Sequence, residues 1–155
     1  MAKRFHFPLE TLLRVRELRE REAQRKVGLK QAEIAQLDAL NRQTAEEILR
    51  RQEILRTRQG GAFTPADLIR ERAWITYLRR TIHQRQTQRT ELVKEFEELR
   101  QVFLHARTQR RIIDKLRERR WEEYAKDRRR TEQSEADDLA RVLQGYQAIA
   151  ATDDE

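Results

Sequence analysis

Between residues 9 and 144 the helical pattern of the sequence is interrupted at one place, residues 58–67. The adjacent Gly60 and Gly61 can adopt the left-handed conformation that ends a helix. After them come a hydroxyl that can cap a second helix, a proline for its first position and a carboxylate for its positive end, namely Thr64, Pro65 and Asp67. The chain can therefore turn back once, and the sequence predicts two helices joined by a short turn.

The composition favours an elongated helical chain. Of the 155 residues, 39% are charged and 37% are hydrophobic, and only four are glycine and two are proline. Strands and short βα units need frequent turn residues, which this sequence lacks. The predicted fold class is therefore all-α, without a compact globular core.

The first predicted helix, residues 8–58, has a seven-residue period. Residues that recur at this interval are the a and d positions of a coiled coil and keep one stripe facing a partner helix. One row is Leu13, Glu20, Val27, Ile34, Asn41, Ile48 and Leu55, and the other is Leu9, Arg16, Ala23, Lys30, Leu37, Thr44 and Arg51. A helix of this length, roughly 75 Å at 1.5 Å per residue, needs another helix against the stripe.

The second predicted helix, residues 65–130, supplies that partner. Its rows keep the same spacing and are Leu68, Ile75, Ile82, Arg89, Phe96, Phe103 and Arg110, and Leu78, Arg85, Leu92, Leu99, Ala106 and Ile113. The predicted architecture is an antiparallel two-helix coiled-coil hairpin in which the second helix is longer than the first. We assign residues 1–130 to this hairpin, with the turn at 59–64, and residues 131–155 to a partly helical C-terminal extension with an acidic end.

A short turn near residue 61 fixes which residues face each other. The numbers of opposed residues should sum to about 123. Ile48 then meets Ile75, and Leu9 lies opposite roughly residue 114. Everything after Leu116 is expected to lack a partner on the first helix, including the apolar residues Trp121, Tyr124, Leu139, Val142, Leu143, Tyr146 and Ile149. An exposed apolar stripe of this kind usually binds another protein.

Several a and d positions near the centre of the predicted seam are polar. They are Lys30, Asn41, Thr44, Arg85 and Arg89. Polar residues in a seam fix the register and weaken the coiled coil, and this is the role we expect for them.

The net charge of +7 comes from 28 arginines and six lysines set against 27 acidic residues. Basic and acidic residues are interleaved over most of the length, as on a solvated helix surface. The one unbroken basic run, residues 128–130, follows Trp121 and Tyr124 and could bind single-stranded nucleic acid. Four acidic residues follow it at once, which argues against nucleic acid as the partner.

The residues needed for catalysis or metal binding are missing. There is no cysteine, and His6, His83 and His105 are too widely separated for a metal site. The glycine pair lacks the lysine of a phosphate-binding loop, and adjacent glutamates on a helix point in different directions. We therefore expect neither an enzyme nor a cofactor. The N-terminus has no apolar run and no segment is apolar enough to span a membrane, so we expect a cytosolic protein.

The N-terminal residues resemble those of a known family. The string Phe5-x-Phe7-x-Leu9-x-x-Leu12-Leu13-x-x-Arg16, followed by Arg19-Glu20 and Glu22-Ala23-Gln24, is similar to the start of the flagellar type III export protein FliJ. A Gly-containing turn, then Trp74-Ile75-x-x-Leu78-x-x-x-Ile82, and a longer second helix extend the resemblance over residues 5 to 130.

The resemblance implies a function and two sets of binding residues. Proteins of this family are similar to the central stalk of rotary ATPases, insert into the ring of the hexameric export ATPase and contact the cytosolic domain of the membrane export gate. They also escort export chaperones. By position, the ATPase-facing residues would be Phe5, Phe7, Leu9, Leu12, Leu13, Arg16, Trp121 and Tyr124. The gate-facing residues would be Trp74, Tyr77 and Leu78, although Trp74 and Tyr77 could equally serve only to cover the seam.

Three alternatives remain open from the sequence. The stalk protein of a virulence type III secretion system would share these features. A generic coiled-coil scaffold would form parallel homodimers, which the glycine turn argues against. A coiled coil that binds nucleic acid would show steep salt dependence.

Overall fold

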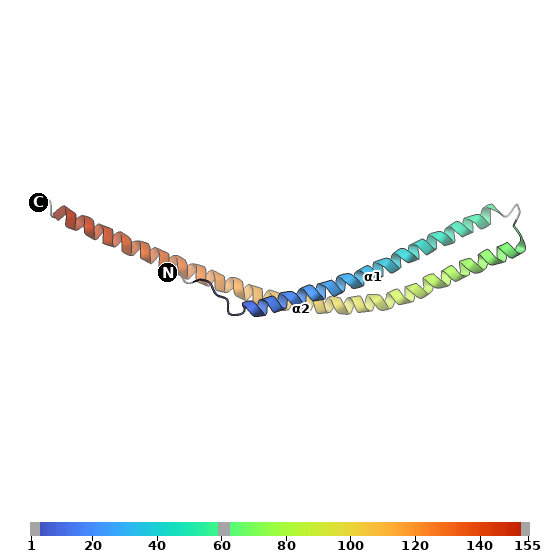
Figure 1. Cartoon of the computed structure of the whole chain (residues 1–155), viewed down its shortest axis with the longest axis horizontal. Coiled ribbons are helices and arrows are strands. Elements are labelled where there is room, and N and C mark those ends of the chain that lie inside the picture. Colours follow the sequence, from blue (N-terminus) through green and yellow to red (C-terminus); the bar gives the residue numbers. More distant parts are fainter. Residues whose placement is uncertain (1–3, 59–62, 153–155) are drawn as a thin grey trace. The chain divides into compact units, whose positions relative to one another are not determined.

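The computed structural model describes residues 4–58 and 63–152, and it describes side chains up to Gln147. These residues form two helices, α1 (Glu10–Thr57) and α2 (Pro65–Thr152), with no strand among them. Figure 1 shows the two elements in chain order. The glycine pair at the predicted turn, the acidic residues 153–155 and the side chain of Ile149 lie outside the described part of the chain.

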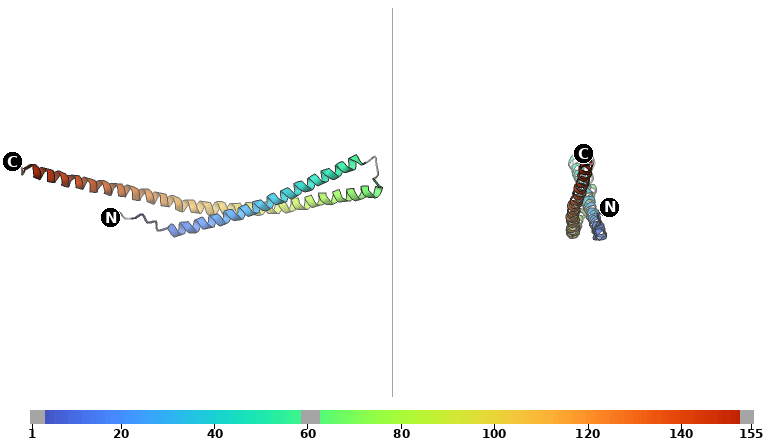
Figure 2. Two further views of the ribbon diagram at one scale, coloured as in Figure 1. Left: turned by 45° about the horizontal axis from the view of Figure 1, so that its top comes forward. Right: turned by 90° about the vertical axis from the view of Figure 1, so that its left-hand side faces the viewer.

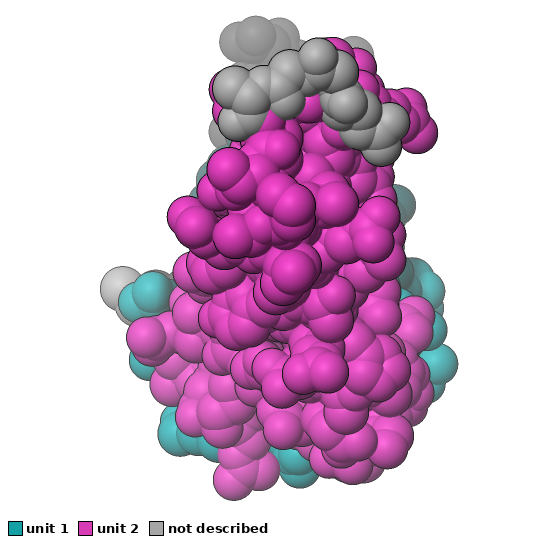
Figure 3. All heavy atoms as spheres, turned by 90° about the vertical axis from the view of Figure 1, so that its right-hand side faces the viewer, with its two compact units in different colours: residues 1–17, 108–155 teal, residues 18–107 magenta. Residues whose placement is uncertain are grey.

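Contacts divide the chain into two compact units, which Figure 3 distinguishes by colour. The first unit combines residues 1–17 with residues 108–155, and the second is residues 18–107. Each unit contains part of α1 and part of α2. Within α2 the helix continues past residue 130, where the sequence predicts the end of the hairpin domain. The domain boundary itself stays a prediction.

In the second unit α1 and α2 run side by side in opposite directions (Figure 2). Its core is formed by Ile48, Ile75 and Leu78, with Leu55 and Ile82 packed against them. Ile48 and Ile75 have numbers that sum to 123, as predicted. The polar contacts of longer side chains fall mostly above this register, with sums from 122 for Arg51 and Glu71 to 129 for Arg85 and Thr44. An extended arginine or lysine reaches more than one residue along the partner helix. The all-α antiparallel coiled coil with a longer second helix is therefore confirmed.

The predicted seam rows are confirmed residue by residue. Every position of the four rows is buried or half-buried except Arg89, which is exposed. Full burial is nevertheless rare, because each helix of a pair covers only one stripe of the other. The buried apolar side chains of the described residues are Phe7, Leu13, Ala23, Leu37, Ile48, Ile75 and Leu78.

The start of α2 has the cap that the sequence predicts. The Asp67 backbone N–H donates to the Thr64 hydroxyl oxygen at 3.2 Å. In return, the Thr64 backbone N–H and its hydroxyl both donate to the Asp67 carboxylate, at 3.2 and 2.7 Å. The hydrogen bond from the hydroxyl holds the pKa of Asp67 below its ordinary value of 3.8, and the hydrogen bond from the backbone N–H contributes less. This reciprocal capping box satisfies donors that α2 would otherwise leave unpaired.

We predict that Ile48→Ala lowers the free energy of unfolding by about 3 kcal/mol, because it removes buried methyl groups from the core. Chemical unfolding followed by circular dichroism at 222 nm measures this. The matched control is Leu49→Ala at the neighbouring residue, whose side chain is 65% exposed. Equal losses for the two substitutions would contradict the assignment of Ile48 to the seam.

We predict that the stabilisation by Asp67 depends on pH. A carboxyl group whose pKa is lowered by folding stabilises the folded state above its unfolded pKa, and this contribution is lost as the pH falls through the folded pKa. Asp67→Asn should therefore lower the thermal midpoint at neutral pH, and the difference from the unsubstituted chain should shrink as the pH falls below the ordinary carboxyl pKa of 3.8. A difference that stays constant over this range would exclude the carboxylate charge as its source.

Candidate protein-binding surfaces

Three aromatic rings gather in the first unit. Phe5, from the segment before α1, contacts Trp121 edge to face, with ring centroids 5.0 Å apart and planes at 87°. It also lies 5.5 Å from Tyr124. Trp121 and Tyr124 are three residues apart on α2 and therefore share a face of the helix, with centroids 5.6 Å apart. We refer to Phe5, Trp121 and Tyr124 as the terminal aromatic cluster.

Neighbouring contacts hold the segment before α1 in place. Phe7 and Leu13 are buried, with 4% and 2% of their surface exposed. The Glu10 carboxylate pairs with Arg117 of α2 at 3.3 Å. Beside the terminal aromatic cluster lies an open hollow of about 400 Å³, lined by Phe5, Asp114, Arg117, Glu118 and Trp121. This part of the first unit therefore offers a partner both an aromatic edge and charged groups.

The sequence predicts no first-helix partner for α2 after Leu116. Glu10 of α1 nevertheless pairs with Arg117, and the segment before α1 adds a further contact. Phe5 contacts both Trp121 and Tyr124. The physical reason is the conformation of the residues before Glu10, which are not helical. A non-helical segment advances up to about 3.3 Å per residue, compared with 1.5 Å in a helix, so it reaches further along α2 than a continued α1 would. Beyond this contact, all side chains from residue 131 to 147 are exposed.

The predicted ATPase-facing residues differ in how much surface they offer. Trp121 is 51% exposed. The half-buried ones are Phe5, Leu9, Leu12, Arg16 and Tyr124, whereas Phe7 and Leu13 are buried. Trp121 is therefore the most exposed of these residues, and Phe7 and Leu13 are covered within the first unit.

A second aromatic pair lies in the other unit. Trp74 and Tyr77 stack with centroids 5.1 Å apart and planes at 29°, and they are 43% and 56% exposed. The Arg51 guanidinium lies 5.3 Å from the centroid of the Trp74 ring. Leu78, the third residue predicted to face the gate, is buried in the core beside Ile48. We refer to Trp74 and Tyr77 as the hairpin aromatic pair.

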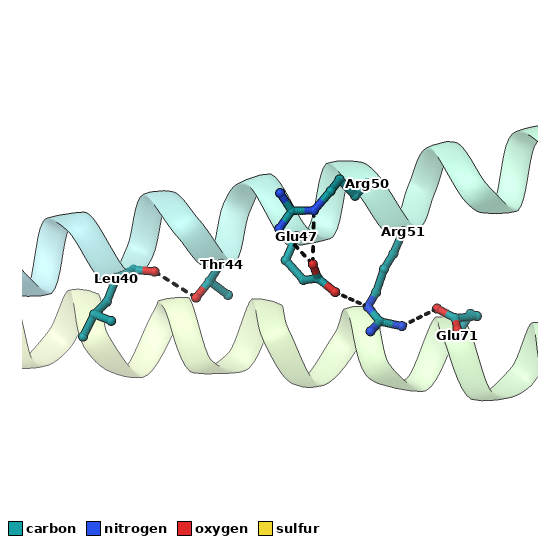
Figure 4. A network of polar contacts seen from close by, with 6 residues as sticks. All are labelled: Leu40, Thr44, Glu47, Arg50, Arg51 and Glu71. Atoms are coloured by element: carbon teal, nitrogen blue, oxygen red, sulfur yellow. Dashed lines mark hydrogen bonds and ion pairs between the residues drawn. The ribbon is translucent and has the colours of Figure 1, made fainter.

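A network of charges fixes the position of Arg51 (Figure 4). Arg51 of α1 bonds to Glu71 of α2 at 2.8 Å and to Glu47 of its own helix at 2.7 Å. The hydrogen bond to Glu71 raises the pKa of Arg51 above its ordinary value, and the hydrogen bond to Glu47 contributes less. Glu47 also accepts from Arg50 at 3.0 Å. Arg51 therefore occupies the seam and also lies over the Trp74 ring. The seven-residue period predicts the first of these positions but not the second.

The polar centre of the seam is also in the second unit. Arg85 donates to the Thr44 hydroxyl at 2.8 Å, and Arg89 pairs with Asp38 at 2.7 Å. Lys30 pairs with Glu95 at 2.8 Å. The Asn41 side-chain oxygen is buried and has no hydrogen-bond partner among the described residues. These cross-helix contacts fit the expectation that polar residues fix the register.

Two other kinds of site are absent from the described residues. These residues contain no group of three histidine, aspartate or glutamate side chains placed to hold a metal ion. None of the helices in the described ranges is long and apolar enough to cross a membrane. The expectation that the chain needs no cofactor stays a prediction.

The described residues form an antiparallel coiled coil with two exposed aromatic sites. The family model for the flagellar FliJ protein matches residues 5–147, which is nearly the whole chain. The chain therefore belongs to the flagellar FliJ family, whose members are non-enzymatic components of the flagellar export apparatus. The resemblance seen in the N-terminal residues is confirmed. Neither curated proteins nor solved structures gave a match to this chain.

We predict that Phe5→Ala exposes Trp121 to solvent, because it removes the ring that covers one side of the indole. In a Trp74→Phe background, which leaves Trp121 as the only tryptophan, the fluorescence emission should shift to longer wavelength and quenching by acrylamide should increase. His6→Ala, at the exposed neighbouring residue, is the control and should change neither. An unchanged spectrum for Phe5→Ala would contradict the Phe5–Trp121 contact.

Proposed function

We propose that this chain is a non-enzymatic stalk of the flagellar type III protein export apparatus. It inserts into the ring of the hexameric export ATPase and links that ring to the cytosolic domain of the membrane export gate. The observation that carries the proposal is the match of nearly the whole chain to the flagellar FliJ family. The two separate exposed aromatic sites support it, because a linker needs one binding surface for each partner.

The terminal aromatic cluster is the proposed surface for the ATPase. Trp121 offers an exposed indole beside Phe5, and aromatic side chains are enriched at the centres of protein interfaces. The flanking Arg117 and Glu118 can form a polar rim around it. Leu9, Leu12 and Arg16 are half-buried and extend this surface along the start of α1.

The hairpin aromatic pair is the proposed surface for the export gate. Its rings are already stacked and held by Arg51, so binding would order few additional side chains. Leu78, on the same turn of α2, is buried in the core and so fixes the position of the helix that carries the pair. The same surface could also take part in escorting export chaperones.

The proposed mechanism needs no chemistry from the stalk. If the ATPase-facing surface binds one state of the ring more tightly than another, binding shifts the ring toward that state and favours its assembly. The ATPase hydrolyses the nucleotide, and the stalk transmits the change of state to the gate. The chain would then be cytoplasmic and would reach the inner membrane only through its partners.

We predict that the chain raises the turnover of the export ATPase and promotes assembly of its ring. Trp121→Ala should reduce both effects about tenfold, since it removes the exposed indole at the centre of the proposed contact. Trp74→Ala should leave ATPase stimulation intact and weaken binding to the cytosolic domain of the gate by a similar factor. The measurements are steady-state ATP hydrolysis, ring assembly by light scattering, and pull-down with the purified gate domain.

The control is Val102→Ala, which truncates an apolar side chain that is 58% exposed and lies outside both surfaces. Val102→Ala should change neither the effects on the ATPase nor the binding to the gate domain. If the unsubstituted chain alters neither turnover nor ring assembly, the ATPase role is excluded. If the two tryptophan variants lose both activities together, the assignment of one partner to each surface is wrong.

A further inference from the structure

The face of α2 that carries Trp121 and Tyr124 continues toward the C-terminus. At about 100° per residue, the side chains on this face lie within an arc of about 80°. They are Trp121, Tyr124, Arg128, Glu132, Glu135, Leu139, Val142 and Tyr146. From residue 131 to 147 every side chain is exposed, and Leu139, Val142 and Tyr146 are 65%, 54% and 69% exposed. We call this face the C-terminal stripe.

The chemistry of the C-terminal stripe has an order that suits pairing with itself. It begins with the aromatic Trp121 and Tyr124 and becomes basic at Arg128. It then turns acidic at Glu132 and Glu135 and ends with Leu139, Val142 and Tyr146. Reversing this order places apolar residues against aromatic ones and acidic residues against basic ones. A surface that complements its own reversed copy is the requirement for a twofold interface.

We propose that two copies of this chain associate through antiparallel pairing of their C-terminal stripes. In the register that fits best, opposed residue numbers sum to 263. Tyr124 then packs against Leu139 of the second copy, and Trp121 packs against Val142 of the second copy. Arg128 lies opposite Glu135 of the second copy, and the twofold axis repeats each contact.

The registers one heptad to either side fit poorly, which disfavours them. A shift of seven residues one way places Glu135 opposite Glu135 of the second copy. A shift the other way places Arg128 opposite Arg128 of the second copy. Like charges directly opposed in a coiled coil are unfavourable and select against these arrangements. In the proposed register Arg128 keeps its bond of 2.7 Å to Glu132 of its own helix, because a guanidinium has five donors.

The length of the stripe is sufficient for a weak dimer. Residues 121–146 span about 39 Å of helix, well beyond the 12 to 15 residues below which helices in isolation are marginal. Eight apolar side chains meet in the two ends of the interface. The charged centre contributes more to specificity than to affinity. We therefore expect a dissociation constant for the dimer on the order of 10 μM.

This pairing would restrict the proposed function. It covers the exposed side of Trp121, so a paired chain could not present that residue to the export ATPase. Only this consequence depends on the proposed function, since the association itself can be measured without any partner. The dimer would then keep the chain inactive until the ATPase competes for the same surface.

Sedimentation velocity of the full chain from about 1 to 300 μM tests the proposal, with a concentration-dependent dimer as the expected result. Leu139→Glu should weaken association about thirtyfold or more, because the twofold axis doubles the loss of apolar contact. The matched control, Gln144→Glu, adds the same charge about 140° around the helix from Leu139 and should leave association unchanged. A monomer at every concentration, or equal weakening by both variants, overturns the proposal.

A charge exchange tests the antiparallel register. Arg128→Glu alone and Glu135→Arg alone each place two pairs of like charges in the interface, and each should weaken association about tenfold. Mixing the two variants restores both pairs of opposite charge and should yield heterodimers with nearly the original affinity. Circular dichroism checks that both variants remain helical. If the mixture associates no better than the separate variants, the proposed register is wrong.

Discussion

The interaction on which this structure depends is the burial of one narrow stripe of α1 against one narrow stripe of α2. A helix that contacts a single partner can bury few side chains completely, and Leu13, at 2% exposed, is the best covered. Stability therefore comes from the repetition of modest contacts along the seam, such as those around Ile48 and Ile75. Polar residues can interrupt such a seam as long as they find partners across it, as Arg85 and Thr44 do.

The seam leaves much aromatic surface uncovered, and the chain keeps this surface ordered. Phe5 packs against Trp121 in one unit, and the Arg51 guanidinium lies over Trp74 in the other. In both cases a residue from the first part of the chain fixes a ring on α2. An aromatic side chain held in one conformation loses less entropy on binding than a free one. This is the physical reason for assigning binding roles to these two sites and not to the scattered exposed leucines.

The local pattern of the sequence was sufficient to predict the seam and the cap of α2. A seven-residue period fixes which residues share a face, and a cap depends on residues three apart, as in Thr64 and Asp67. The contact of Phe5 with Tyr124 was beyond this reasoning, because it depends on a non-helical segment that no periodicity describes. The position of Arg51 over Trp74 was missed for a related reason, since the heptad pattern shows where a side chain starts and not where a long one ends. The roles assigned to these residues in binding stay proposals.

The exposed part of α2 after residue 130 has a thermodynamic consequence for recognition. Its backbone hydrogen bonds are supported by the helix itself and by pairs such as Arg128–Glu132, with every side chain from residue 131 to 147 open to water. Opening these turns costs far less free energy than opening the core around Ile48, so they should exchange their amide hydrogens earliest. Binding of a ligand there must offset the entropy lost when these turns become ordered. The affinity is therefore lower and the binding readily reversible.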